Sequence, residues 1–300
     1  RDLRMSRGLG DVYKRQLEAP DSPFLNRALQ AYAVGSVFKP VLAAAALEAS
    51  LAPEYDCNGA VVVDGQIFRC AGGVPHGEVD LSAALAKSCN GYFIRLGQQL
   101  GAQALLQQAQ ALGFGRSIGL AEGLTAQSGA LPGAEELAQS GQLANFSFGQ
   151  GSLLATPLQV AAMMNTIANG GVYRAPCLLD CTLDETSGEE LSAFARPQAE
   201  RVLTEQTAAA LRTMLEQTVA EGTAQDASGL PGGAAGKTGT AQTGQFTAEG
   251  KERKNLWFAG FYPAEDPQYT IVVLQDGQTQ AAVSSAAVFA QLCTALHWLG

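Results

Sequence analysis

The stretch Gly35-Ser36-Val37-Phe38-Lys39-Pro40 places a serine three positions before a lysine, and an apolar run from Val41 to Leu51 follows it. Residues three apart on a helix share a face, so a helix that begins near Ser36 brings its hydroxyl within about one hydrogen-bond length of the Lys39 ammonium. Serine needs an adjacent base to attack a carbonyl, and burial or a neighbouring cation can lower the pKa of a lysine enough to make it that base. The unpaired N–H groups of a helix start can hold a developing oxyanion. The alternative interpretation is a surface serine and lysine, because this spacing is expected about once by chance in such a chain.

The composition describes a folded domain with a sizeable core. Of the 300 residues 47 % are hydrophobic and 16 % are charged, and the net charge is −9. These values exclude wholesale disorder, and no basic face indicates a nucleic-acid partner. No apolar run reaches the ~18 residues that a membrane span requires, and no signal peptide is visible.

Residues 1–16 differ from the remainder of the chain. Seven charged positions occur there without a clear period, and the string from Met5 to Gln16 looks like translated adapter sequence. We therefore interpret residues 1–16 as a non-native stretch and residues 17–300 as the domain. A short surface helix is the alternative interpretation of the first sixteen residues.

The spacing of the six cysteines does not resemble a zinc site, which usually shows close pairs. Cys57 and Cys70 flank a segment in which Asp64-Gly65 lies between β-branched and aromatic residues, and this pattern predicts a hairpin. A Cys57–Cys70 disulfide at its base would contribute about 3 kcal/mol in an oxidising compartment. Two reduced thiols that pack as small apolar groups are the alternative.

Helix and strand signals divide the rest of the chain. A helix that begins at Ser36 should end before Pro53, and Thr156-Pro157 and Thr204 are typical starts of two more helices. The other expected elements are a short helix at 81–87, a helix pair over 92–112 that breaks at Gly101, strands at 234–242, 256–262 and 269–274, and a final helix at 284–299.

Two further segments carry side chains that suit a Ser–Lys site. Ser88-Cys89-Asn90 places a hydroxyl and an amide two residues apart at a helix–loop junction. Lys237-Thr238-Gly239-Thr240 lies in a strand-like run, where Gly239 allows a substrate backbone to add at the edge. Lys237 supplies a positive charge, and the two threonines supply hydroxyls, for binding a carboxylate. Each segment alone favours a structural role, whereas the three in this order are improbable by chance.

The three motifs together are those of serine β-lactamases and penicillin-binding proteins. The sequence resembles the transpeptidase domain of class B penicillin-binding proteins over roughly residues 24–300. Four further stretches carry the resemblance: Leu85–Phe93, Phe148–Gln159, Ile167–Gly171 and Trp257–Phe261. The resemblance implies a D,D-transpeptidase that cross-links peptidoglycan stem peptides, is inhibited by β-lactams, and uses no cofactor or metal.

The resemblance also implies roles for the motif residues. Ser36 is the acylated nucleophile and Lys39 is its base. Ser88 relays a proton to the leaving amine, and Asn90 orients Lys39 and holds the substrate amide. The terminal carboxylate of the stem peptide binds at Lys237, Thr238, Gly239 and Thr240, and the N–H groups of Ser36 and Thr240 form the oxyanion hole.

The implied fold is α/β (α+β): helices flank an antiparallel sheet, and a mostly helical lobe, about residues 52–200, is inserted. The implied location is the extracytoplasmic face of the bacterial plasma membrane, with membrane-associated cell-wall synthesis proteins as partners. Members of the family carry a membrane anchor, a pedestal domain and two strands before the nucleophile helix, and this sequence shows none of them. We therefore expect a fragment that is marginal or insoluble alone, because one edge of the sheet is uncovered.

Other functions use the same residues. A serine β-lactamase or a D,D-carboxypeptidase transfers the acyl group to water; Glu135 and Glu136 lie in the region of the deacylating glutamate but lack its asparagine partner. A β-lactam sensor or an inert scaffold would acylate once or never. A Ser-His-Asp triad needs His76 or His297 beside a nucleophile, and neither has a supporting motif.

Overall fold

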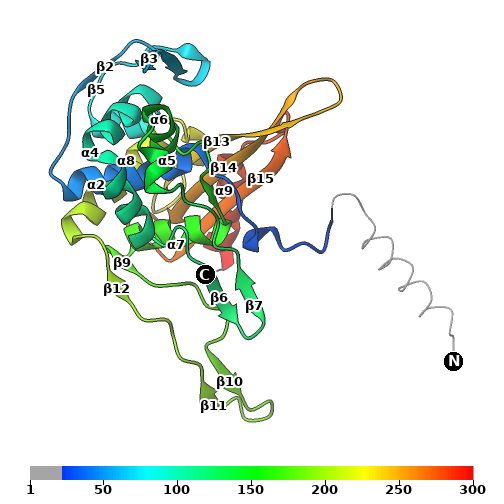
Figure 1. Cartoon of the computed structure of the whole chain (residues 1–300). Coiled ribbons are helices and arrows are strands. Elements are labelled where there is room, and N and C mark those ends of the chain that lie inside the picture. Colours follow the sequence, from blue (N-terminus) through cyan, green and yellow to red (C-terminus); the bar gives the residue numbers. More distant parts are fainter. Residues whose placement is uncertain (1–21, 300) are drawn as a thin grey trace.

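The centre of the fold is a three-stranded antiparallel sheet. The computed structural model describes residues 22–299, so the interpretation of residues 1–16 lies outside the described part. The strands are β13 (Ala235–Phe246), β14 (Glu252–Tyr262) and β15 (Tyr269–Gln278), in the order β13-β14-β15 (Figure 1). The three expected late strands are confirmed, and each is longer than the apolar run that predicted it.

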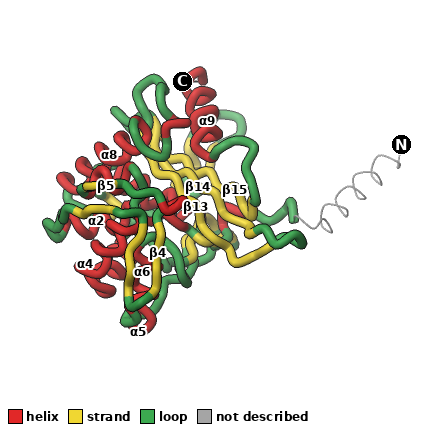
Figure 2. Tube along the Cα trace, turned by 90° about the horizontal axis from the view of Figure 1, so that it is seen from above, coloured by secondary structure: helices red, strands yellow, loops and turns green. Residues whose placement is uncertain are grey.

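The middle strand separates two hydrophobic cores, because successive side chains of a strand point to opposite faces. Trp257, Ala259 and Phe261 belong to the main core. Phe258 packs on Phe289 of α9 (Ser285–Leu299), with the ring centroids 4.5 Å apart. Figure 2 shows α9 on one side of the strands and the other helices on the opposite side. The helix-flanked antiparallel sheet that the sequence predicted is therefore present.

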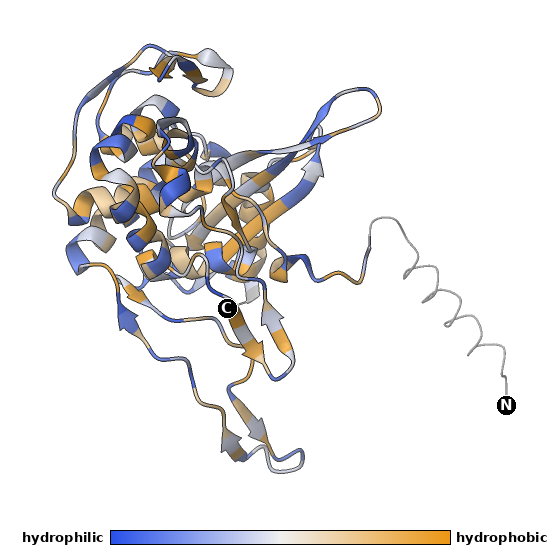
Figure 3. Cartoon of the chain, in the orientation of Figure 1, coloured by the Kyte–Doolittle hydropathy of each residue, from blue (hydrophilic) through white to orange (hydrophobic). Residues whose placement is uncertain are grey.

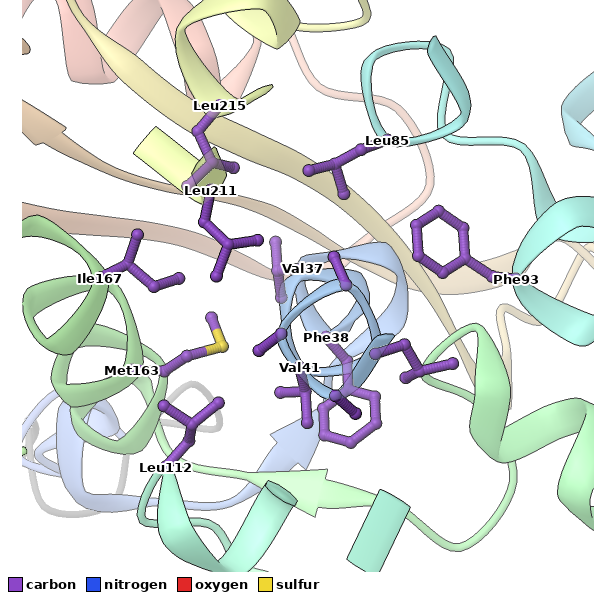
Figure 4. Close-up of a cluster of buried hydrophobic side chains, with 14 of the residues drawn as sticks. Val37, Phe38, Val41, Leu85, Phe93, Leu112, Met163, Ile167, Leu211 and Leu215 are labelled. Carbon is purple, nitrogen blue, oxygen red and sulfur yellow. The ribbon is translucent and has the colours of Figure 1, made fainter. Parts of the chain in front are cut away.

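The main core surrounds the segment that opened the sequence analysis. A 3-10 turn, η2 (Gly35–Phe38), leads directly into α2 (Lys39–Glu48). Nearly all of α2 is buried, because its small alanines let α4 (Asn90–Ala111) and α8 (Glu205–Ala220) pack closely against it. Figure 4 shows side chains of α8 and of α7 (Pro157–Ala168) around Val37 and Val41. The nucleophile segment is thus a buried core element, which excludes the surface interpretation.

Local sequence signals explain where the helices begin. Thr156 caps α7 with a capping box that includes Gln159, and Pro157 occupies its first turn. The Thr204 side chain caps α8 by accepting a hydrogen bond from the N–H of Thr207. The helix α4 (Asn90–Ala111) is interrupted at Gly101, which adopts a φ of 79°. These boundaries agree with the predicted ones.

The expected hairpin is present as β3 (Ala60–Val63) and β4 (Gln66–Arg69), joined by Asp64 and Gly65. Both turn residues have positive φ, of 46° and 79°, as a two-residue hairpin turn requires. The hairpin packs against α4 and α6 (Ser140–Ser147) through Val61, Val63 and Phe68. It lies at the top of Figure 1.

Shorter elements complete the chain: η1 (Arg27–Leu29), β1 (Tyr32–Ala33), β2 (Tyr55–Cys57), η3 (Ala71–Gly73), β5 (Gly77–Val79), α3 (Leu81–Ala86), β6 (Ile118–Ala121), β7 (Leu124–Ala126), α5 (Ala134–Leu137), β8 (Leu154–Ala155), β9 (Val172–Tyr173), β10 (Cys181–Leu183), β11 (Glu190–Ala193), β12 (Glu200–Arg201) and η4 (Gln225–Ala227). The polar turn between β13 and β14 projects into solvent and is hydrophilic in Figure 3. Within residues 22–299, the helices are all too short or too polar to cross a bilayer.

Candidate active site

Ser36 lies on η2, in close backbone contact with strand β13. Gly35 adopts a φ of +65°, and a Cβ at this position would lie 2.7 Å from the carbonyl oxygen of Thr240. The N–H of Gly35 donates to the carbonyl of Gly149 over 2.8 Å. Glycine is therefore required here both by the left-handed backbone and by the close approach of two segments. The turn fixes Ser36 directly beside the end of the Lys237–Thr240 stretch.

Lys39 is completely buried and makes three hydrogen bonds. Its Nζ donates to the carbonyl oxygen of Ser88 (2.7 Å), to Ser88 Oγ (3.1 Å) and to Asn90 Oδ1 (2.8 Å). An ammonium has three N–H donors, so all three are occupied. Among the described residues, none of the three hydrogen bonds of Lys39 goes to Ser36, although the sequence predicted direct contact between the Ser36 hydroxyl and the Lys39 ammonium. The structure thus shows Lys39 held by the Ser88–Asn90 segment.

The environment of Lys39 favours its neutral form. Burial lowers the pKa of Lys39 to about 7, while the charges of Cys89 and Cys70 act in the opposite direction. The Nζ also lies 5.4 Å from the centre of the Phe93 ring. A lysine with a pKa near neutrality can both accept and return a proton, as a general base must.

The Ser88-Cys89-Asn90 segment lies at the junction of α3 and α4. Ser88 adopts a φ of 55°, which is unusual for a residue with a side chain and is typical of strained functional sites. Cys89 caps α4, and Asn90 is its first residue. The amide of Asn90 accepts from Lys39 and donates to the carbonyl of Arg69 over 2.8 Å. Asn90 therefore links the buried lysine to the β3–β4 hairpin.

On the opposite wall, β13 carries Lys237, Thr238, Gly239 and Thr240. Lys237 is fully buried, and its Nζ donates to Thr223 Oγ1 (3.4 Å) and to the carbonyl of Thr238 (3.3 Å). Burial, followed by the charge of Lys39, lowers the pKa of Lys237 well below its usual value. A Cβ at Gly239 would lie 2.9 Å from a methyl group of Val37. Gly239 thus lets β13 lie directly against the turn that carries Ser36.

These segments enclose one cleft of about 780 Å³. Ser36, Ser88, Asn90, Thr238, Gly239 and Thr240 line it, whereas Lys39 and Lys237 are buried and do not appear among the lining residues. Three cationic residues, Arg69, Lys87 and Lys254, also line it, and none of the described lining residues is acidic. The cleft is therefore suited to an anionic ligand, although the whole chain carries a net charge of −9.

Sequence reasoning missed several residues of this cleft. Thr223, in the loop after α8, shares a hydrogen bond of 2.6 Å with Thr238. Gln150 donates to the carbonyl of Thr240 over 3.5 Å. Gln150 belongs to the Phe148–Gln159 stretch that supported the resemblance, so a signal existed for it. Thr223 had no signal, because only the fold brings that loop to β13.

Neither histidine of the chain lies among the residues that line the cleft. His297 is on α9, across the sheet from the nucleophile. The Nδ1 of His76 lies 3.4 Å from Cys57 Sγ, in a group that also contains Cys70 and Cys89. The Cys57 and Cys70 sulfurs are 3.6 Å apart and both are free thiols. The spacing of these four residues in the sequence did not indicate that they converge. Within the described residues, they form a group whose side chains could hold a metal ion.

Comparison with known proteins identifies the family. The penicillin-binding protein transpeptidase domain matches residues 7–294. The peptidoglycan D,D-transpeptidase PbpA of Mycolicibacterium smegmatis is 32 % identical, over 94 % of this chain and 58 % of its own length. The D,D-transpeptidase domain of an Eggerthella lenta peptidoglycan glycosyltransferase superposes with a TM-score of 0.84 at 28 % identity, over 97 % of this chain and 72 % of that one.

A further similar structure is the ceftriaxone acyl-enzyme of penicillin-binding protein A from M. tuberculosis. Its TM-score is 0.83 at 27 % identity, over 96 % of this chain and 65 % of that one. The chain spans about half the length of the curated relatives that it matches. With the match to nearly the whole chain, these findings show that it belongs to the penicillin-binding protein transpeptidase family, as the transpeptidase domain of a class B member.

Proposed function

We propose that this chain is a D,D-transpeptidase that forms an acyl-enzyme at Ser36 and transfers the acyl group to an amine of a second peptidoglycan stem peptide. One observation carries the proposal: Lys39 is buried behind the cleft and held by Ser88 and Asn90, next to the turn that presents Ser36. Names of relatives such as peptidoglycan D,D-transpeptidase PbpA support the same reaction.

Acylation begins when Lys39 takes the proton of the Ser36 hydroxyl. The ammonium uses three donors for its three partners, whereas a neutral amine has two N–H groups and one lone pair. Loss of one proton therefore frees a lone pair for Ser36. The Ser36 oxygen then attacks the carbonyl of the scissile D-Ala-D-Ala bond. The N–H groups of Ser36 and Thr240 stabilise the oxyanion, because the close approach of η2 and β13 brings these two segments together.

Breakdown of the tetrahedral intermediate releases D-alanine. Ser88 Oγ lies 3.1 Å from Lys39 Nζ and lines the cleft, so it can pass the proton from Lys39 to the leaving amine. Asn90 keeps Lys39 in place during this step through its 2.8 Å hydrogen bond.

The carboxylate at the end of the stem peptide binds against β13. Thr238 and Thr240 line the cleft and offer hydroxyls there, and Lys237, which precedes them on the strand, is buried. A carboxylate that approaches this wall also favours the charged form of Lys237, since an opposite charge raises the pKa of a buried lysine. A β-lactam carries an equivalent carboxylate, and its opened ring stays attached to Ser36.

The acyl group passes to an amine rather than to rapidly activated water. A β-lactamase that uses a glutamate needs that carboxylate in the cleft, and no acidic residue is among the described residues that line it. Glu136, one of the two candidates, accepts a hydrogen bond from Ser152 over 2.7 Å and is not a lining residue. A transpeptidase therefore suits the cleft better than a β-lactamase does.

The natural partners follow from the relatives. We infer that the stem peptides belong to peptidoglycan outside the plasma membrane, because several relatives are named peptidoglycan D,D-transpeptidases. Membrane-associated cell-wall synthesis proteins are the proposed partners of the full-length protein.

The test is acylation by a fluorescent penicillin, with wild type compared with Ser36→Ala. One adduct per chain on Ser36, by intact-protein mass spectrometry and peptide mapping, is expected for the wild type and none for the variant. A wild type without an adduct would identify an inert scaffold. Rapid multiple turnover of nitrocefin would instead identify a β-lactamase. A depsipeptide or thioester substrate, offered together with a D-amino acid, separates the remaining alternatives. A transpeptidase transfers the acyl group to the D-amino acid, a carboxypeptidase transfers it to water, and a sensor keeps it.

A further inference from the structure

Lys254 lies in the cleft, yet the proposed reaction leaves it without a role. It is half-buried on β14 and lines the cleft together with Gln242 of β13. Among the described residues, the Lys254 ammonium has neither a hydrogen-bond partner nor a carboxylate within ion-pair distance. A lysine that is held at a cleft surface without a partner is available to bind an anionic group of a ligand.

The charged neighbours of Lys254 are directed elsewhere. The Arg253 guanidinium donates to a backbone carbonyl of β15 over 3.1 Å. Lys251 is exposed and is not among the residues that line the cleft. The Glu252 carboxylate accepts a hydrogen bond of 3.0 Å from Gln242 and does not line the cleft either. Of the basic residues in this part of the chain, Lys254 is therefore the one that contributes to the cleft.

The free edge of β13 sets the path of a bound stem peptide. Within the described chain β13 pairs with β14 alone, and Thr238, Gly239, Thr240 and Gln242 of β13 line the cleft. An extended peptide can therefore add to this edge as an antiparallel strand. In the proposed reaction the terminal carboxylate lies at Thr238 and the attacked carbonyl lies at the N–H of Thr240. The peptide residues before the scissile bond then continue towards Gln242.

The strand register places Lys254 beside this path. Lys254 lies opposite Gln242, and opposite residues of an antiparallel pair point to the same face with their Cβ atoms about 5 Å apart. Gln242 is two residues beyond Thr240, which is about 7 Å along the strand. Successive peptide residues are about 3.8 Å apart, so the residue before D-Ala-D-Ala lies next to Gln242. A long side chain on that residue can reach the Lys254 ammonium.

We propose that Lys254 is a specificity-determining residue, which binds a carboxylate on the side chain of the stem-peptide residue before D-Ala-D-Ala. A side chain that ends in a carboxylate forms an ion pair with Lys254, whereas one that ends in an amine alone is repelled. The cleft therefore selects stem peptides with a diamino-dicarboxylic acid at this place over those with a lysine. This inference rests on the proposed function, because that function sets the direction of the peptide along β13.

The other cations of the cleft support an anionic ligand without setting this preference. Arg69 and Lys87 line the wall opposite β13, and the Lys87 ammonium donates to the carbonyl of His76 over 3.2 Å. Their field attracts any anion that enters the cleft. Lys254, in contrast, lies on the strand that pairs with β13 and is therefore next to one particular peptide side chain. Variants of Arg69 and Lys254 separate the two contributions.

The first experiment compares three depsipeptides that differ only in the residue before D-Ala-D-lactate. This residue is 2-aminopimelic acid, its side-chain carboxamide of the same length, or lysine. The kcat/KM of the wild type, from release of D-lactate, should be about fivefold higher for the carboxylate than for the carboxamide, as a partly exposed ion pair allows, and lowest for lysine. Raising the salt concentration should reduce the difference.

Variants test whether Lys254 carries the preference. Lys254→Gln should bring the carboxylate-to-carboxamide ratio of kcat/KM close to one, and Lys254→Glu should favour lysine. Lys254→Arg keeps the charge and should keep the preference. Lys251→Gln removes an equal charge from an exposed position and is the matched control, in which the ratio should stay that of the wild type. A preference that survives in Lys254→Gln and is lost in Arg69→Gln would overturn the assignment.

Failure of this subsite and failure of the proposed function give different results. A wild type that forms a Ser36 adduct with benzylpenicillin, yet reacts equally fast with the three depsipeptides, would refute the subsite alone. A wild type with neither an adduct nor release of D-lactate would refute the proposed function.

Binding to Ser36→Ala then decides on Lys254. The probes are the corresponding D-Ala-D-Ala peptides, and NMR titration measures their affinity. Equal affinity for the carboxylate and carboxamide peptides, or a preference that persists when Lys254→Gln is added to Ser36→Ala, would overturn the inference.

Discussion

The side-chain oxygen of Asn90 lies 2.8 Å from the Nζ of Lys39, and the same amide donates to the carbonyl of Arg69. This single side chain therefore connects the buried base, the start of α4 and the hairpin that overhangs the cleft. Asn90 thus orients Lys39, although the two residues are 51 positions apart in the sequence.

Asn90→Ala removes the hydrogen bond that orients Lys39. Hydrogen bonds to charged groups contribute about 1.5–3 kcal/mol, so we expect the second-order rate constant of penicillin acylation to fall roughly 10- to 100-fold. The measurement is a stopped-flow or gel time course with a fluorescent penicillin. Asn165→Ala, on the exposed face of α7, is the control and should acylate like the wild type. An unchanged rate in Asn90→Ala would refute the orienting role.

Acylation should depend on pH through Lys39. Burial lowers the pKa of Lys39 to about 7, and only the neutral amine can accept the Ser36 proton. The acylation rate constant should therefore rise with pH, reach half of its maximum near pH 7, and level off above it. Rate constants between about pH 5.5 and about pH 8.5 check this, with circular dichroism as a control for folding. A rate that falls through neutral pH would exclude Lys39 as the base.

Lys39 should also reduce the stability of the fold at low pH. Its pKa is about 7 in the folded chain and near the usual 10.5 when unfolded, so between these values the unfolded state binds more protons. The free energy of unfolding of the wild type should therefore rise with pH across this interval. Lys39→Met lacks the part of this dependence that Lys39 contributes, so the variant should be more stable than the wild type at about pH 6.5 and should lose that advantage towards pH 10.

Urea unfolding of both proteins at about pH 6.5 and about pH 9 measures the difference. Lys251→Met, which replaces an exposed lysine of the turn between β13 and β14, is the matched control and should change stability little at either pH. If Lys39→Met were less stable than the wild type at the lower pH, the hydrogen bonds of Lys39 would outweigh the cost of its burial.

Much of the fold could be predicted because local signals coincide with element ends. Thr156 and Thr204 begin helices, Gly101 breaks one, and Asp64-Gly65 forms the hairpin turn. These features depend on a few neighbouring residues, which the sequence displays directly. The convergence of Ser36, Ser88 and Lys237 was inferred from a resemblance to a family and not from such signals.

The remaining features depend on contacts between distant segments. Ser36 and Lys39 are three residues apart, yet the Lys39 amine turns towards Ser88, because a buried ammonium needs three acceptors and the Ser88–Asn90 segment supplies them. Thr223 reaches Lys237 only because α8 packs beside β13. The group of Cys57, Cys70 and Cys89 has no close sequence pair, so spacing could not indicate it.

The close approach of η2 and β13 yields the last prediction, which compares two glycines. Gly35 has a φ of +65° and Gly244 has a φ of +68°. An alanine at either position would therefore raise the backbone energy by a similar amount, about 1–2 kcal/mol. A Cβ on Gly35 also meets the Thr240 carbonyl at 2.7 Å, whereas a Cβ on Gly244 meets nothing within 4 Å. Backbone atoms cannot rotate away as a side chain can, so Gly35→Ala must separate the nucleophile turn from β13.

We therefore expect Gly244→Ala to lower the free energy of unfolding by about 1 kcal/mol and to leave acylation unchanged. Gly35→Ala should lose at least about 3 kcal/mol and acylate more than roughly 100-fold slower, because the N–H groups of Ser36 and Thr240 no longer face one oxyanion. Urea unfolding and penicillin acylation of the two variants supply both numbers. Equal losses at the two positions would mean that the contact between Gly35 and Thr240 is not as close as the structure has it.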